Sequence, residues 1–204
     1  MLVGIVALLV TMVPVRAWAA PISVAGLTFS DELGGFELIS ASGSGTLEDP
    51  FVVTESMVAD TGGTLVIRGM SPQFGNRIGT LHQAGFALTK VVINRTTQAW
   101  SAFSLELQEI RGTPSDYYDG LSFGQGSSVG KPFLSNRFRD MEDLEEPHDS
   151  VSFRDGRVGL GETVTFSVVI TDATPVSPIY LVQEPSRIVV QLEPAGTRRN
   201  QRRL

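Results

Sequence analysis

Apolar and polar side chains alternate along most of this chain, and a period of two is typical of β-strands rather than helices. The clearest example is Glu162–Thr171, in which Val164, Phe166, Val168 and Ile170 would lie on one face of a strand. Threonine and serine occupy most of the positions between them. A strand of this kind covers a core with one face and meets water with the other.

Further stretches with this alternation recur at intervals, separated by turns rich in glycine, proline or aspartate. They are Ile22–Phe29, Phe36–Ser40, Phe51–Glu55, Thr64–Arg68, Ala87–Asn94, Phe103–Leu107, Val151–Phe153, Pro178–Val182 and Arg187–Leu192. The sequence therefore predicts an all-β fold: a single antiparallel β-sandwich, immunoglobulin-like or jelly-roll-like, of about eight to ten strands. Residues 111–149 are the least regular part. We expect them to be one long loop region that carries function, forms short extra strands or is mobile.

The start of the chain has the pattern of a secretory signal peptide. Met1–Val15 is almost entirely apolar, and Ala17 and Ala19 place small residues before a cleavage point that follows Ala19. The apolar run is shorter than the roughly 20 residues that a spanning helix needs. We therefore expect a signal peptide over 1–19, a β-sandwich domain over 20–194 and a basic disordered tail over 195–204. The mature protein would be secreted or periplasmic, with no transmembrane anchor.

The composition excludes several kinds of chemistry. Without cysteine the chain has no thiolate metal ligand or thiol nucleophile, and its two histidines, His82 and His148, cannot form a three-histidine zinc site. No G-x-S-x-G motif marks a serine-hydrolase nucleophile. The net charge of −6 disfavours nucleic acid as a partner, because phosphate binding needs clustered Lys and Arg. We expect a protein that is not an enzyme and has no cofactor, with calcium as the one alternative, and we interpret His82 as solvent-exposed.

Several short segments, most of them in the second half of the chain, resemble the extracellular β-sandwich ectodomains of bacterial exported proteins of the PEP-CTERM and related sorting classes. The segments are Asn94–Leu107, Gly120–Phe123 with Val151–Phe153, Gly159–Glu162 leading to Phe166, and Ile179–Pro185; Gly43–Phe51 is similar to the opening of bacterial surface repeats. The resemblance implies an exported β-sandwich. Such proteins end in a Pro-Glu-Pro motif, an apolar helix and a basic cluster. Here only Ala195-Gly196-Thr197 separates Glu193-Pro194 from the arginines, so anchoring by that route is not expected.

One pair of aromatic residues is a candidate ligand-binding site. Tyr117, Tyr118 and Asp119 lie together in a polar loop. Aromatic rings beside a carboxylate suit sugar rings, and the same arrangement suits a protein contact. The alternative is that the tyrosines pack at the edge of the sandwich. For Trp100, at the start of a predicted strand, we expect a place in the core or at its edge.

An acidic run is the candidate metal site. Its carboxylates are Asp140, Glu142, Asp143, Glu145, Glu146 and Asp149. Calcium takes six to eight oxygen ligands, and loops of exported β-sandwiches supply them in clusters. The spacing does not match the EF-hand pattern and no glycine provides its turn, so a solvated, self-repelling loop is the alternative.

The basic end of the chain suggests one more contact. Arg198, Arg199, Arg202 and Arg203 would give a weak, salt-sensitive attraction to an anionic surface such as phospholipid or lipopolysaccharide. A disordered terminus with no partner is the alternative.

Three hypotheses about function follow. The first is an exported, non-enzymatic interaction or structural module that contacts an extracytoplasmic protein or glycan through its loops. The second is a carbohydrate-binding module that uses Tyr117, Tyr118 and Asp119 and is assisted by calcium. The third is a hydrolase with a pair of carboxylates, whose separation the sequence does not reveal.

Overall fold

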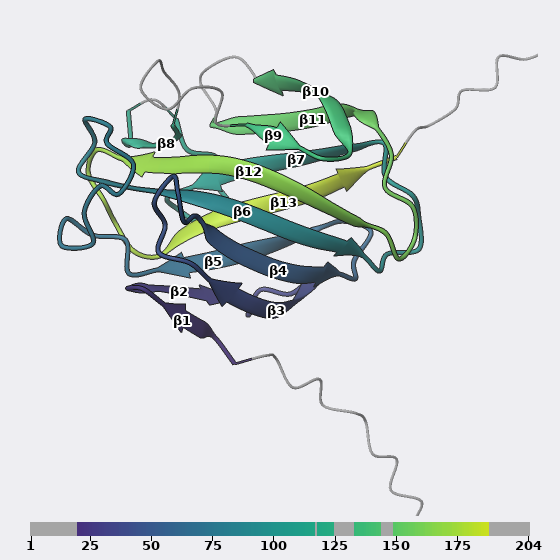
Figure 1. Ribbon diagram of the computed structural model, residues 1–204, viewed down its shortest axis with the longest axis horizontal. Coiled ribbons are helices and arrows are strands. Elements are labelled where there is room, and N and C mark those ends of the chain that lie inside the picture. The colour runs from purple at the N-terminus through teal and green to yellow at the C-terminus, as the bar shows by residue number, and fades with distance from the viewer. Residues whose placement is uncertain (1–19, 117, 125–132, 144–148, 188–204) are drawn as a thin grey trace, which may run out of the picture.

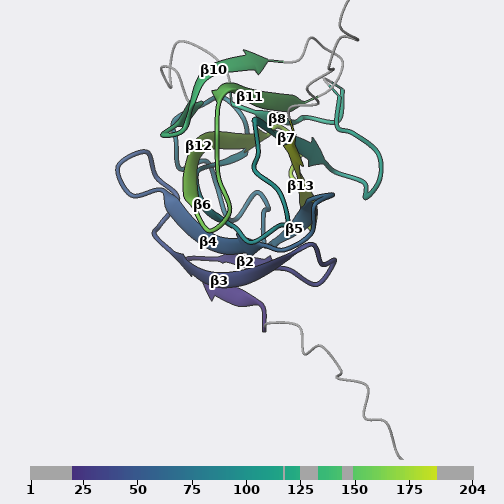
Figure 2. The same ribbon diagram turned by 90° about the vertical axis from the view of Figure 1, so that its right-hand side faces the viewer.

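The computed structural model describes residues 20–116, 118–124, 133–143 and 149–187. Within these ranges the chain forms thirteen β-strands and no helix. The strands make two sheets that lie face to face (Figures 1 and 2). The prediction of an all-β fold is therefore confirmed. No helix in the described residues is long and apolar enough to cross a membrane.

The first sheet is antiparallel throughout. Its seven strands, in spatial order, are β1 (Ile22–Val24), β2 (Leu27–Ser30), β5 (Gly63–Arg68), β13 (Ile179–Ser186), β7 (Ala102–Gln108), β11 (Ser150–Gly156) and β10 (Phe138–Asp143). The stretch predicted as one strand, Ile22–Phe29, is a hairpin here. Its loop is Ala25-Gly26, and both residues have positive φ, as a tight two-residue hairpin turn requires.

Among the described residues the second sheet contains a parallel pair of strands, which departs from the expected antiparallel arrangement. Its strands are β3 (Phe36–Ser42), β4 (Phe51–Met57), β6 (Ala84–Asn94), β12 (Thr163–Asp172) and β8 (Leu121–Phe123), with β9 (Leu134–Ser135) also paired to β12. The expectation of a wholly antiparallel fold is wrong at β4 and β6, which are parallel. The reason is topological: after β4 the chain crosses to the other sheet as β5 and returns, so β6 runs in the same direction as β4.

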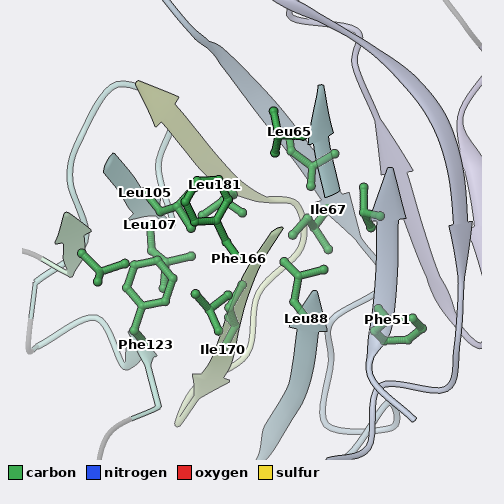
Figure 3. Close-up of a cluster of buried hydrophobic side chains, with 14 of the residues drawn as sticks. Phe51, Leu65, Ile67, Leu88, Leu105, Leu107, Phe123, Phe166, Ile170 and Leu181 are labelled. Atoms are coloured by element: carbon green, nitrogen blue, oxygen red, sulfur yellow. The ribbon is translucent and has the colours of Figure 1, made fainter. Parts of the chain in front are cut away.

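The core lies between the sheets and consists of inward-facing side chains from both. Phe166 of β12 stacks on Phe103 of β7, with ring centroids 4.6 Å apart, and lies 4.8 Å from Phe153 of β11. At the other side of the core, Phe51 of β4 meets Phe29 of β2 edge to face at 5.5 Å. Figure 3 shows the apolar side chains that converge from both layers.

Most predicted strands agree with the structure, and two regions contain more strands than we predicted. Three strands, β8, β9 and β10, lie within 111–149, where we predicted a long irregular region. These, with the hairpin of β1 and β2, make the strand count exceed the expected eight to ten. Of the predicted strand Arg187–Leu192, only Arg187 is among the described residues. The predicted signal peptide and tail also lie outside them.

Trp100 is buried, as predicted, at 2 % exposure, and its indole Nε1 donates to Thr96 Oγ1 at 3.1 Å. The same threonine hydroxyl donates to Asn94 Oδ1 at 2.7 Å. Asn94 is itself fully buried and donates through Nδ2 to Gln98 O and Val158 O. These three side chains therefore hold together the loops that follow β6 and β11.

Candidate functional site

Four connecting segments gather at one end of the two sheets, on the left in Figure 1. They are residues 43–50, 69–83, 109–120 and 173–178. The register brings them together: β6 begins where β12 ends, at the pair Ala84 and Asp172, and β13 begins where β7 ends, at the pair Tyr180 and Gln108. We call these four segments the loop end.

The loop end contains two of the three residues predicted to bind a ligand. Tyr118 is 90 % exposed. Both carboxylate oxygens of Asp119 accept backbone amides of its own turn: Oδ1 accepts from Leu121 N at 3.0 Å and Oδ2 from Asp116 N at 3.3 Å. Asp116 Oδ1 in turn accepts from Tyr118 N at 2.8 Å. Both aspartates therefore fix the turn that presents Tyr118, and Tyr117 lies outside the described residues.

This turn is bonded to the neighbouring loops. Thr174 Oγ1 donates to Asp119 O at 2.9 Å, and Ala173 N donates to Gly120 O at 2.9 Å. On the other side, the Ser115 hydroxyl accepts from Glu109 N at 2.9 Å. The segments 109–120 and 173–178 therefore form one braced unit.

Large apolar side chains are concentrated at the loop end. Of eight that are exposed among the described residues, five lie here: Leu47, Leu81, Ile110, Tyr118 and Val176. Three of them sit in the braced unit, and we call Ile110, Tyr118 and Val176 the apolar patch. Its members are 68 %, 90 % and 36 % exposed. Tyr118 was predicted from the sequence, whereas Ile110 and Val176 were missed, because single apolar residues in polar loops carry no periodic signal.

Carboxyl groups at the loop end influence one another's pKa. Burial raises the pKa of Asp172, and the negative charge of Asp119 adds to this effect. Burial also raises the pKa of Glu109, again with contributions from Asp119 and Asp172. His82 acts in the opposite direction on Asp172. We expected His82 to be solvent-exposed, but it is half-buried and its Nδ1 is covered, because it adjoins the start of β6 within the loop end.

Asp172 has a structural task. Its side chain is fully buried, and its oxygens accept from Thr174 N at 2.8 Å and Val176 N at 3.3 Å. Two backbone amides of the segment 173–178 are thereby satisfied, which fixes the loop that carries Val176.

These pKa shifts predict that the carboxyl groups titrate in two separate pH ranges. Asp172 and Glu109 should titrate above their unperturbed pKa, whereas Asp60, which accepts hydrogen bonds from the Thr97 hydroxyl and amide, should titrate below it. Carbon-detected NMR of the side-chain carboxyls against pH measures each one separately.

Thermodynamic linkage gives the direction in which the free energy of unfolding changes with pH. An acid whose pKa is raised on folding binds more protons in the folded state, so its contribution to the free energy of unfolding falls as pH rises from its unfolded pKa through the folded one. For Asp172 that window begins near pH 3.9. An Asp172 midpoint at or below the unperturbed value would contradict the expected burial.

The predicted metal ligands are spread over a strand and its flanks. Asp140 lies on β10 opposite Arg154 of β11, so this part of the acidic run is paired strand and not the loop that we expected. Asp149 Oδ1 accepts from Phe123 N at 3.3 Å. Glu142 and Asp143 end β10, while Glu145, Glu146 and also His148 lie outside the described residues. Among the described residues no group of three or more His, Asp or Glu side chains is placed to hold a metal.

A pocket lies on the outer face of the first sheet. It has a volume of about 150 Å³ and is lined by Ser104, Glu106, Ser150, Val182 and Glu184. Glu106 accepts a hydrogen bond from Gln108 Nε2 at 2.7 Å. The lining contains two carboxylates and no aromatic ring, so it offers a sugar no stacking surface.

A scan against models of protein families finds no match to this chain, and a search of curated proteins finds none either. The function proposed below therefore rests on the geometry of the loop end.

Proposed function

We propose that this protein is an exported, non-enzymatic interaction module that binds an extracytoplasmic partner through its loop end. The observation that carries the proposal is the gathering of exposed apolar side chains on a braced unit at one end of the fold. Interfaces take their binding energy from a few large side chains held in place by their surroundings, and tyrosine is among the residue types enriched there. The apolar patch has both properties.

The carboxyl groups of the loop end support binding over catalysis. A catalytic acid or base must reach the substrate. The most buried of these carboxyls, on Asp172, instead accepts two backbone amides of its own loop. Asp119 likewise uses both its oxygens within the turn. Their task in the proposal is to hold the apolar patch in shape.

Two further expectations belong to this proposal. The arrangement is that of an immunoglobulin-like or jelly-roll-like sandwich, supported by the two facing sheets and the core between them. Export is supported by the apolar run of Met1–Val15 and the small residues that follow it. Exported protein that begins at Ala20 would agree with export and cleavage, and protein that stays in the cytoplasm with its leader attached would contradict it.

Removing the apolar patch tests the binding proposal. We expect the variant Ile110→Ala/Tyr118→Ala/Val176→Ala to lose binding to envelope preparations of the producing organism by on the order of tenfold or more. Its unfolding free energy should change little, by about 0.5 kcal/mol per exposed site. Quantitative binding of fluorescently labelled protein measures the first effect, and thermal unfolding measures the second.

The matched control removes exposed apolar side chains away from the loop end. Ile39 on β3, Leu134 on β9 and Leu160 between β11 and β12 are 51 %, 61 % and 62 % exposed, so Ile39→Ala/Leu134→Ala/Leu160→Ala also truncates three exposed apolar side chains. It should bind like the wild type. If the control loses binding and the patch variant keeps it, the loop end is not the binding surface.

Glycan binding is the second candidate, and the exposure of Tyr118 favours it. An exposed ring can stack on the apolar face of a sugar. A glycan array read with the wild type and with Tyr118→Ala distinguishes the two candidates. A signal that disappears in the single variant supports a glycan ligand, and an array without any signal, combined with envelope binding that the patch variant loses, supports a protein partner.

A further inference from the structure

A cluster of three polar side chains lies inside the apolar core. Lys90 of β6 and Glu55 of β4 both have fully buried side chains, and Lys90 Nζ lies 2.6 Å from Glu55 Oε2. Gln183 of β13, in the opposite sheet, is also fully buried, and its Nε2 lies 3.3 Å from the same Oε2 atom. One carboxylate oxygen therefore contacts both an amine and a carboxamide nitrogen.

Several polar atoms of this cluster lack the hydrogen bonds that a purely structural polar cluster would be expected to make. Glu55 Oε1 and Gln183 Oε1 are buried and have no hydrogen-bond partner among the described residues. Within the same residues Lys90 Nζ has one hydrogen-bond acceptor, Glu55, and it lies 5.7 Å from the centre of the Phe36 ring. Replacing a buried ion pair by apolar residues of similar size is often neutral or stabilising, so a buried pair is weak evidence of a purely stabilising role.

The three groups are those that amide exchange between side chains requires. The reaction needs an amine with a free lone pair, a carbonyl carbon to accept it, and a base that moves one proton from the amine to the leaving nitrogen. Burial lowers the pKa of Lys90, because the apolar surroundings disfavour the ammonium form. Glu55 Oε2 is positioned for the proton transfer, since both nitrogens lie against it.

Gln183, whose side-chain carbonyl carbon is the group that the amine would attack, lies on a strand that is held on both sides. At Gln183, β13 pairs on one side with β5 and on the other with β7, so it is a central strand. Gly62 packs so closely that a Cβ on it would lie 1.8 Å from the Gln183 carbonyl oxygen. A group held in this way stays near its reaction partner, which raises the rate of a reaction within one molecule.

We propose that Lys90 and Gln183 join in an intramolecular amide bond that links the two sheets, with Glu55 as the proton carrier. Lys90 Nζ attacks Cδ of Gln183 and gives one proton to Glu55. The bond from Cδ to Nε2 then breaks, Glu55 passes the proton to Nε2, and ammonia leaves. The products are one secondary amide and one ammonia, Glu55 is regenerated, and no oxidant or other reagent is consumed.

The mass of the purified full chain tests the proposal without any variant. Loss of ammonia should lower the intact mass by about 17 Da relative to the mass calculated from the sequence of the isolated chain. Mass spectrometry resolves a covalent change of this size. Tandem spectra of a tryptic digest should contain a branched peptide that joins Lys90 to Gln183. Trypsin should also fail to cut after Lys90.

Variants assign the roles. Glu55→Gln keeps the shape but removes the base, and Gln183→Ala removes the acceptor, so both should have the full sequence mass. Glu106→Gln, on the outer face, is the matched control and should retain the loss of about 17 Da. A wild type of full sequence mass overturns the proposal. A loss of about 18 Da with Lys90 joined to Glu55 overturns the assignment of Gln183, because direct condensation with a carboxylate releases water.

Discussion

Replacing Phe166 by alanine is expected to lower the free energy of unfolding by about 3–5 kcal/mol, which is the usual cost of emptying a large aromatic site in a core. The ring is fully buried on β12 and touches three rings of the opposite sheet. Phe103 and Phe153 lie 4.6 and 4.8 Å away, and Phe138 stacks at 6.0 Å. No single neighbour can fill the space that the substitution leaves.

Urea denaturation measures this effect, and the chain contains a suitable probe. Trp100 is buried 5.4 Å from Phe103, so its fluorescence reports on the same region of the core. Phe166→Leu should lose less than Phe166→Ala, because it keeps part of the apolar volume. Ile39→Ala, at an exposed site, should change the free energy by about 0.5 kcal/mol or less. A loss below about 1 kcal/mol in Phe166→Ala would mean that the two sheets do not depend on this contact.

Removing the buried amine is expected to have an effect of similar size. Lys90→Met removes the nitrogen that Glu55 contacts in the core, and removing one partner of a buried pair in this way costs about 3–5 kcal/mol. Adding Glu55→Leu to the same protein should recover most of that loss, since the pair is then replaced by apolar side chains. A second substitution that raises stability is an unusual result and easy to recognise.

The comparison is designed so that it does not depend on the proposed amide. Lys90→Met and Lys90→Met/Glu55→Leu both lack the amine, so neither can form the cross-link, and their difference isolates the buried carboxylate. Chemical denaturation measures this difference in the free energy of unfolding, with the same dependence on denaturant concentration (m-value) used for both variants. Equal stability of the single and double variants would show that Glu55 reaches solvent or another partner when Lys90 is absent.

The strands could be predicted from the sequence because each is a local pattern. The inward positions of β12, from Val164 to Ile170, are visible as every second residue, and all are buried. The pairing of the strands is not local. Nothing in Phe51–Met57 or Ala84–Asn94 indicates that these strands lie side by side and in parallel, since the crossover through β5 decides it.

The same distinction applies to the polar residues. Asp119 was predicted as a ligand from its neighbours in the sequence, and only the fold reveals the two backbone amides that donate to its carboxylate. Glu55, Lys90 and Gln183 come from three strands far apart in the sequence. Each interrupts an apolar face alone, so a pattern search treats it as an exception and cannot find the cluster.

The order of the strands determines when this chain can fold. β5 pairs with β13, and β6 pairs with β12, so central strands of both sheets await partners from the last third of the chain. Contacts between such distant segments make folding slow, because a long loop must close before they form. Neither sheet can therefore be completed until the last third of the chain is available. The last strands, β12 and β13, then complete the two layers.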